Sequence, residues 1–160
     1  MEAMDTEKLI KELTAARDDF HDALAAVTPE SMTTPGLVGE WSGREVVAHL
    51  GYWAGRAVET IHAVEEGRAE EFGLDEPPVD EVNETVARVA RSTPPATVHK
   101  RETASVEALV ERLRRLDPSL LSARLPDGST LLEAAAEDGA DHYREHADEL
   151  RRTLGAQPHG

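Results

Sequence analysis

Apolar side chains spaced three and four residues apart constrain the fold of this chain more than any other feature. The first such stretch contains Leu9, Leu13, Ala16, Phe20, Leu24 and Val27. This spacing places the six side chains on one face of an α-helix, whereas a half-buried β-strand would need alternation. No convincing alternating segment occurs in the 160 residues. We therefore predict an all-α protein.

The second predicted helix has a well-marked start. Ser42 and Glu45 form a capping-box pattern, in which each side chain accepts a hydrogen bond from an otherwise unpaired backbone N–H. Apolar residues then recur from Val46 to Val64, and Gly67 follows them. The linker after it, Glu70 to Pro78, contains one glycine and two prolines. Because a loop this long in a small bundle is often functional, we expect it to border a ligand cavity.

The second half of the chain continues as helices. A short helix is predicted from about Val79 to Arg91 and a further one from about Thr103 to Leu116, so Pro94-Pro95 interrupts the third helix of the bundle. Ser129 or Thr130 can cap the last helix, which runs to about Leu154. Each long helix has one apolar face that it cannot bury alone, which predicts an antiparallel four-helix bundle, a single domain over residues 1–160. Its expected core includes Leu13, Phe20, Leu50, Trp53, Leu113 and Leu150.

Charge and composition restrict the expected partners. The chain has 32 acidic and 17 basic residues, a formal net charge of -15, and no cysteine. Such a surface repels phosphate backbones and anionic lipids, so we expect neither nucleic acid nor membrane as a partner. No segment resembles a signal peptide or a membrane span, which makes a cytoplasmic protein the default expectation. The expected partner is a small-molecule substrate, and the composition is also compatible with a homodimer.

A histidine pair is the sharpest chemical signal. His142 and His146 differ by only 40° around a helix, and they occupy positions where the apolar stripe of the last helix would carry leucines. Gly139 and Ala135, about one and two turns before His142, leave space beside the pair. Two imidazoles can bind one metal ion, although buried histidines that are merely hydrogen-bonded remain the alternative.

A third ligand must come from another helix, and His49 on the second helix is the best candidate. Three imidazoles suit zinc, nickel or a similar divalent ion and leave coordination positions open. Asp138 and Glu149 flank the pair on the last helix, either as acceptors that orient the imidazoles or as ordinary solvated carboxylates. The surface is the expectation for the other histidines considered: His21, His62 and His99.

The string Glu40-Trp-Ser-Gly-Arg-Glu-Val-Val-Ala-His-Leu-Gly-Tyr-Trp53 resembles the start of the second helix in the DinB-like family of metal-binding four-helix bundles. The similarity continues in Val82-Asn83-Glu84 and in His142-x-x-x-His146, and so covers nearly the whole chain. In that family one second-helix histidine and two last-helix histidines hold a divalent metal. The resemblance therefore implies that His49, His142 and His146 are the ligands.

The same superfamily includes S-transferases that use bacillithiol, mycothiol or glutathione, metal-dependent hydrolases, and mycothiol-dependent maleylpyruvate isomerases. The isomerases place a carboxylate at the position matching His142 and carry an additional C-terminal domain, so we do not expect their reaction here. The leading hypothesis is a metal-dependent transferase that adds a low-molecular-weight thiol to an electrophile or xenobiotic. The alternatives are hydrolysis by metal-activated water, a non-catalytic metal- or ligand-binding bundle, and an acidic dimerisation module without metal.

Three residues are candidates for substrate binding. Arg56 follows His49 by seven residues, about 20° around the helix, and could hold a carboxylate of the thiol or the substrate. Trp53 and Asn83 are expected to line the same pocket. The alternatives are a surface arginine among glutamates and an asparagine that only caps or packs.

Overall fold

The computed structural model describes residues 5–156 of the chain, and over this range it contains helices, loops and two isolated β-bridges but no strand. The α-helices are α1 (Thr6–Leu24), α2 (Gly43–Glu65), α3 (Val79–Arg91), α4 (Pro95–Arg115), α5 (Leu131–Ala136) and α6 (His142–Ala156). The shorter turns are η1 (Ala69–Glu71), η2 (Pro118–Ser122) and the π-helical η3 (Glu137–Asp141). The predicted all-α class is confirmed. None of the described helices is both long and apolar enough to cross a bilayer.

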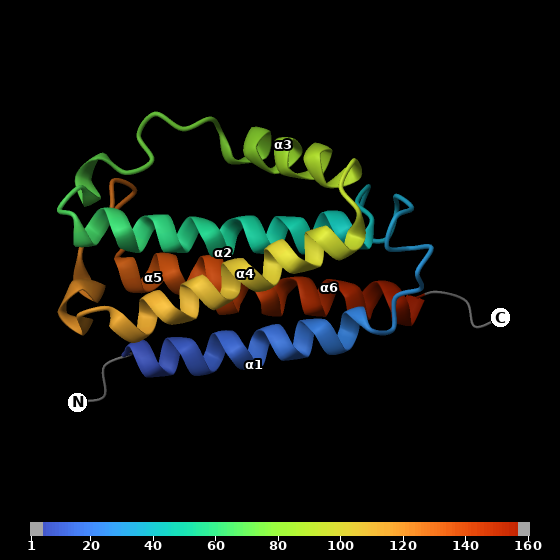
Figure 1. The fold of residues 1–160 in the computed structure, drawn as a ribbon, viewed down its shortest axis with the longest axis horizontal. Coiled ribbons are helices and arrows are strands. Elements are labelled where there is room, and N and C mark those ends of the chain that lie inside the picture. The colour runs from blue at the N-terminus through green and yellow to red at the C-terminus, as the bar shows by residue number, and fades with distance from the viewer. Residues whose placement is uncertain (1–4, 157–160) are drawn as a thin grey trace.

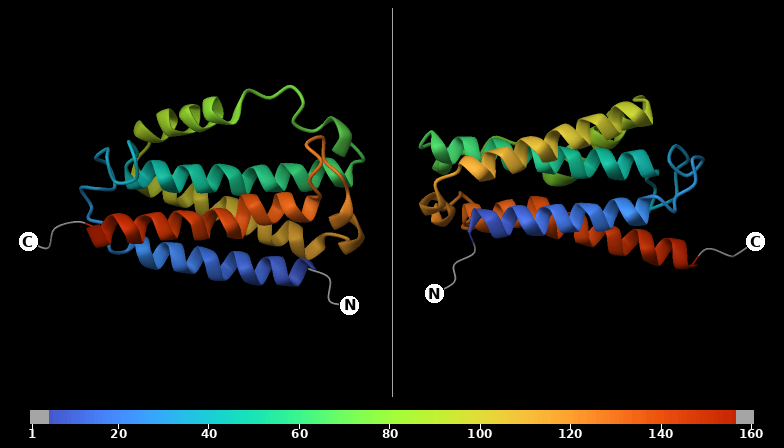
Figure 2. Two further views of the ribbon diagram at one scale, coloured as in Figure 1. Left: turned by 180° about the vertical axis from the view of Figure 1, so that it is seen from behind. Right: turned by 60° about the horizontal axis from the view of Figure 1, so that its bottom comes forward.

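The bundle is formed by α1, α2, α4 and the segment α5–η3–α6, which lie side by side (Figures 1 and 2). The colour gradient shows that α1 and α6 run in one direction and α2 and α4 in the other. The remaining helix, α3, lies outside against α2 and returns the chain to the end at which α4 begins. The antiparallel helical bundle is thus confirmed, with α3 added as a crossover.

The proline pair separates two helices and does not merely interrupt one. Pro94 caps α4, and Pro95 occupies its first turn. Proline is well suited to this position, because the first backbone N–H groups of a helix have no partner within the helix and the proline ring presets helical φ. The helix therefore begins at Pro95, eight residues before Thr103, where the sequence predicted its start.

The last predicted helix is likewise divided. Its backbone leaves helical geometry at Gly139, where φ is -104° and ψ is -107°, within the π-helical turn η3. A Cβ at Gly139 would stand 3.5 Å from Leu13 Cδ1 of α1, so the glycine lies where neighbouring helices pack closely. As a result α6 begins at His142, and π-helical turns of this kind often accompany functional sites.

The core contains the expected aliphatic and aromatic residues with one correction. Five of the six predicted core residues are buried: Leu13, Phe20, Leu50, Leu113 and Leu150. Trp53 is only half-buried, and its indole Nε1 donates to Asn83 Oδ1 of α3 at 2.9 Å. Because α3 lies outside the bundle, this position of α2 faces the boundary between α2 and α3 and not the core.

A buried carboxylate links α1, α4 and α6 inside the core. Glu102 of α4 is 1% exposed, and it accepts hydrogen bonds from Arg17 of α1 and from the hydroxyl of Tyr143 on α6. His21 Nε2 lies 3.1 Å from the same carboxylate, so His21 is half-buried and not at the surface as predicted. This Glu102 network fixes Tyr143, the residue directly after His142.

Candidate metal centre

Three histidines from two helices converge between α2 and α6. His49 Nε2 lies 2.7 Å from His142 Nε2, and the ring centroids of the three histidines are 4.5 to 5.0 Å apart. One ligand nitrogen from each of His49, His142 and His146 lies within 4.8 Å of the other two. The structure thus brings together the three residues expected as ligands.

The start of α2 is held so that His49 points to α6. The backbone N–H and the hydroxyl of Ser42 both donate to Glu45 Oε1, at 3.0 and 2.9 Å. The other carboxylate oxygen of Glu45 accepts from Arg91 Nε at 2.9 Å, which ties this end of α2 to the end of α3. His49 follows Glu45 by four residues, about one turn along the same face of the helix.

Burial keeps two of the imidazoles neutral. His49 is 6% exposed, and burial together with the neighbouring His142 and His146 lowers its pKa to about 3. Burial and the neighbouring His146 lower the pKa of His142 to about 4. Because both pKa values lie far below 7, each of these rings has a free nitrogen lone pair at neutral pH.

The nitrogens of the three rings fit a metal ion. Nδ1 of each ring is buried without a hydrogen-bond partner in the described part of the chain, and Nε2 of His49 faces Nε2 of His142 at 2.7 Å. A divalent ion can bind one nitrogen from each of three such imidazoles at about 2.0–2.1 Å. The donor set fits a divalent metal of borderline softness and leaves coordination positions for another ligand.

The two expected supporting carboxylates differ in position. Glu149 Oε2 lies 3.3 Å from His146 Nδ1, within ion-pair distance but outside hydrogen-bond geometry. Asp138 lies on η3, four residues before His142, and no hydrogen bond joins it to a histidine among the described residues. Burial, and after it the neighbouring Glu137, raise the pKa of Asp138 to about 7, although Arg56 opposes the rise.

The expected substrate-binding residues are already engaged with one another or with the linker. Asn83 accepts from Trp53, and its side chain lies near enough to His49 to oppose the lowering of that residue's pKa. Arg56 forms a bidentate ion pair with Glu76, and its guanidinium carbon lies 4.0 Å over the ring of Phe72. The linker therefore lies against the same face of α2 as His49, but about 10 Å along the helix from it.

Sequence reasoning missed one aromatic neighbour of the histidines. The Trp41 ring centroid lies 4.9 Å from that of His49. Trp41 stands directly before the cap of α2, where its backbone pairs with Val38 in an isolated bridge. Its place beside the capping box was visible in the sequence, but the fold back onto His49 was not.

The model of the mycothiol maleylpyruvate isomerase N-terminal domain matches residues 13–147, which include the three histidines. No curated protein matches the chain by sequence.

Solved structures share the fold. The colibactin self-resistance protein ClbS, crystallised in complex with double-stranded DNA, is 18% identical and superposes with a TM-score of 0.77 over 99% of this chain and 100% of that one. An uncharacterised protein from Escherichia coli UTI89 is 14% identical, with a TM-score of 0.80 over 96% of this chain and 94% of its own. One from Clostridium difficile 630 is 9% identical, with a TM-score of 0.79 over 99% and 100%.

These structures correct one expectation. We excluded nucleic acid as a partner because of the net charge of -15, and that exclusion is wrong, since the ClbS structure with this fold contains double-stranded DNA. The physical reason is that net charge sums the whole molecule, whereas phosphate contacts depend on where individual lysines and arginines lie.

Proposed function

Because the chain belongs to the mycothiol maleylpyruvate isomerase N-terminal domain family, we propose that it is a divalent-metal-dependent enzyme that transfers a low-molecular-weight thiol to a small electrophile. The observation that carries this proposal is the convergence of three imidazoles at one buried position. Neutral rings at His49 and His142 leave the positive charge of an ion uncompensated, which favours an anionic ligand such as a thiolate.

In this proposal His49, His142 and His146 hold the ion, with zinc or nickel the best matched to three imidazoles. When bound, the ion lowers the pKa of a coordinating thiol, so that a thiolate is available near neutral pH. The chain has no cysteine, and the thiol must therefore come from a cosubstrate. Glu149 is assigned to orienting the ring of His146, from which it lies 3.3 Å away, and Asn83, held by Trp53, lies beside His49.

We assign Arg56 to binding a carboxylate of the cosubstrate or substrate. Its partner Glu76 is itself a carboxylate on the linker, so an incoming carboxylate can replace it with the same bidentate geometry. Asp138, half-buried and near Arg56, is assigned to the same binding region, where it can hold a proton at its carboxylate near neutral pH.

The test combines metal analysis with a thiol panel. His146→Ala should lose both bound metal and thiol-dependent turnover and yet remain helical, while His62→Ala, at an exposed position of α2, should retain all three. Turnover that needs no thiol would replace the transferase proposal with hydrolysis by metal-activated water. Tight metal retention without any turnover would favour a binding protein. Duplex DNA is tested as a separate ligand, because ClbS was crystallised in complex with double-stranded DNA.

A further inference from the structure

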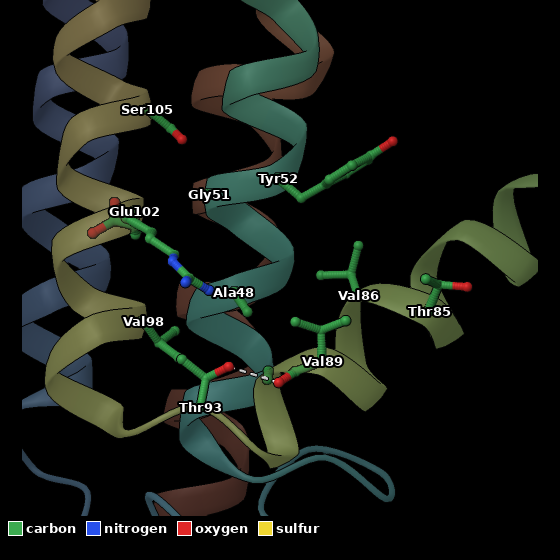
Figure 3. A pocket seen from close by; sticks show the side chains of 12 residues that line it. Ala48, Gly51, Tyr52, Thr85, Val86, Val89, Thr93, Val98, Glu102 and Ser105 are labelled. Atoms are coloured by element: carbon green, nitrogen blue, oxygen red, sulfur yellow. Dashed lines mark hydrogen bonds between the residues drawn. The ribbon is translucent and has the colours of Figure 1, made fainter.

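A second cavity, of about 290 Å³, lies between α2, α3 and α4 (Figure 3). Val86 and Val89 point into it from α3, and Val98 enters it from α4. Ala48 and Gly51 of α2 line its floor. The volume is close to the lower end of the range of about 300–1,000 Å³ that is typical of small-molecule sites.

The cavity is separate from the candidate metal centre. Gly51 lies 200° around α2 from His49, so the two sites occupy different faces of one helix. A Cβ at Gly51 would stand only 2.9 Å from Glu102 Cα, which shows how closely α2 and α4 approach at the floor. Above that contact α3, which packs on α2 from outside the bundle, supplies the remaining wall of the cavity with Val86 and Val89.

Among the described residues, Arg101 is the one basic residue that lines the cavity. The uncharged polar residues of the lining are Tyr52, Thr85, Thr93 and Ser105. Arg101 forms no ion pair with any residue of the described chain, and neither side chain one turn away on α4, Thr97 or Ser105, is acidic. Its charge is therefore available to a ligand.

The lining lacks a carboxylate that would oppose an anion. Glu102 is the one acidic residue in it, and its carboxylate is turned into the core, where it pairs with Arg17 and accepts from Tyr143. Other hollows of this surface include unburied acidic residues, as at Glu7 and Asp18 beside α1 or at Glu70 after α2. In a chain with a net charge of -15, an apolar cavity with a free arginine and no facing carboxylate is the exception.

We propose that this cavity binds a small amphipathic molecule with an apolar body and a carboxylate head. The body lies against Val86, Val89 and Val98, and the head contacts the guanidinium of Arg101. Burial of the apolar body supplies most of the affinity, and the charged contact selects anions over cations.

The experiment uses the full chain and decanoate, below its micelle-forming concentration, as the probe. In methyl NMR spectra, decanoate should shift the signals of Val86, Val89 and Val98, and it should bind more tightly than decylamine. Arg101→Gln should weaken decanoate binding about two- to fivefold, because one exposed charged contact is lost, and should not weaken decanol binding. Arg88→Gln is the matched control, since Arg88 is an exposed arginine of α3 outside the lining.

A second variant tests the apolar wall of the cavity and leaves Arg101 in place. Val89 is 51% exposed, so Val89→Asp should fold and yet abolish decanoate binding by placing a carboxylate in the apolar wall. Unshifted valine signals at saturating decanoate would overturn the proposal. So would equal affinity for decylamine and decanoate, or a concentration-dependent dimer that Val89→Asp dissolves, because the occupant would then be a second copy of the chain.

Discussion

Replacing Glu102 tests how the core holds α6, and therefore His142 and His146, in place. Burial alone would raise the pKa of Glu102, but hydrogen bonds from Arg17, His21 and Tyr143 outweigh it and lower the pKa to about 2. The ordinary value is 4.5, and one pKa unit is worth about 1.4 kcal/mol. The ionised carboxylate therefore contributes about 3 kcal/mol of stability at pH 7.

The sign of the pH dependence follows from the direction of this shift. Because the pKa of Glu102 is lower in the folded protein than in the unfolded chain, the stability it contributes is fully present above pH 4.5. It is lost as the pH falls toward 2, and about 1 kcal/mol remains at pH 3. Other carboxylates titrate equally in wild type and variant, so they cancel in the difference between the two proteins.

We expect Glu102→Gln to unfold about 2–3 kcal/mol more easily than wild type at pH 7, since the amide can replace only part of the interactions with Arg17. For a chain of this length the loss corresponds to a Tm roughly 5–10 °C lower. Urea denaturation followed by circular dichroism measures the difference in free energy of unfolding between wild type and variant. We expect this difference to be smaller at pH 3 than at pH 7. Glu107→Gln, an exposed position on the same helix, is the control.

Two results would refute the reasoning. A Glu102→Gln protein as stable as wild type at pH 7 would mean that desolvation cancels the interactions of the carboxylate. A gap of the same size at pH 3 would mean that the lost stability comes from packing and not from the ionised group.

Three further predictions concern other parts of the molecule. Gly51→Ala should cost about 1–3 kcal/mol in thermal unfolding, because the new Cβ would stand 2.9 Å from Glu102 Cα and force α2 from α4; an unchanged Tm would contradict this close approach. Glu76→Gln should tighten binding of a carboxylate-bearing thiol, measured by calorimetry, because Arg56 is released from its ion pair; weaker binding would argue against the role of Arg56. Chelation of bound metal should lower Tm by roughly 10 °C and change the fluorescence of Trp41, which lies against His49; a chelator without either effect would argue against the metal centre.

The helices could be predicted because their apolar spacing is a local property of the sequence. The path of the chain between the helices was harder to predict from the sequence. Pro94 and Pro95 signal a break, but the same signal fits a kinked helix or a crossover followed by a new helix, and only the packing of α3 outside α2 decides between them. Trp53 was misplaced for the same reason, since its position on the apolar stripe faces α3 and not the core.

The histidine cluster could be predicted because His142 and His146 replace leucines on a core-facing stripe, which is unusual enough to require an explanation. The Glu102 network could not be predicted, since a single glutamate at a helical core position gives no sign of which partners will neutralise it. Arg17 and Tyr143 lie 85 and 41 residues away in the sequence. Local spacing contains no information about contacts at that range.

The segment from Glu40 to Trp53 was the most informative part of the sequence because α2 contacts a different element on each face. Trp41 packs on His49, and the capping box reaches Arg91 of α3 through Glu45. Gly51 permits the close approach of α4, while Trp53 donates to α3. A helix with so many neighbours leaves few positions free to vary, and a short string within it therefore identifies the fold more securely than its length suggests. The same reasoning explains why Arg56, one turn beyond the string and facing the linker, was hardest to interpret.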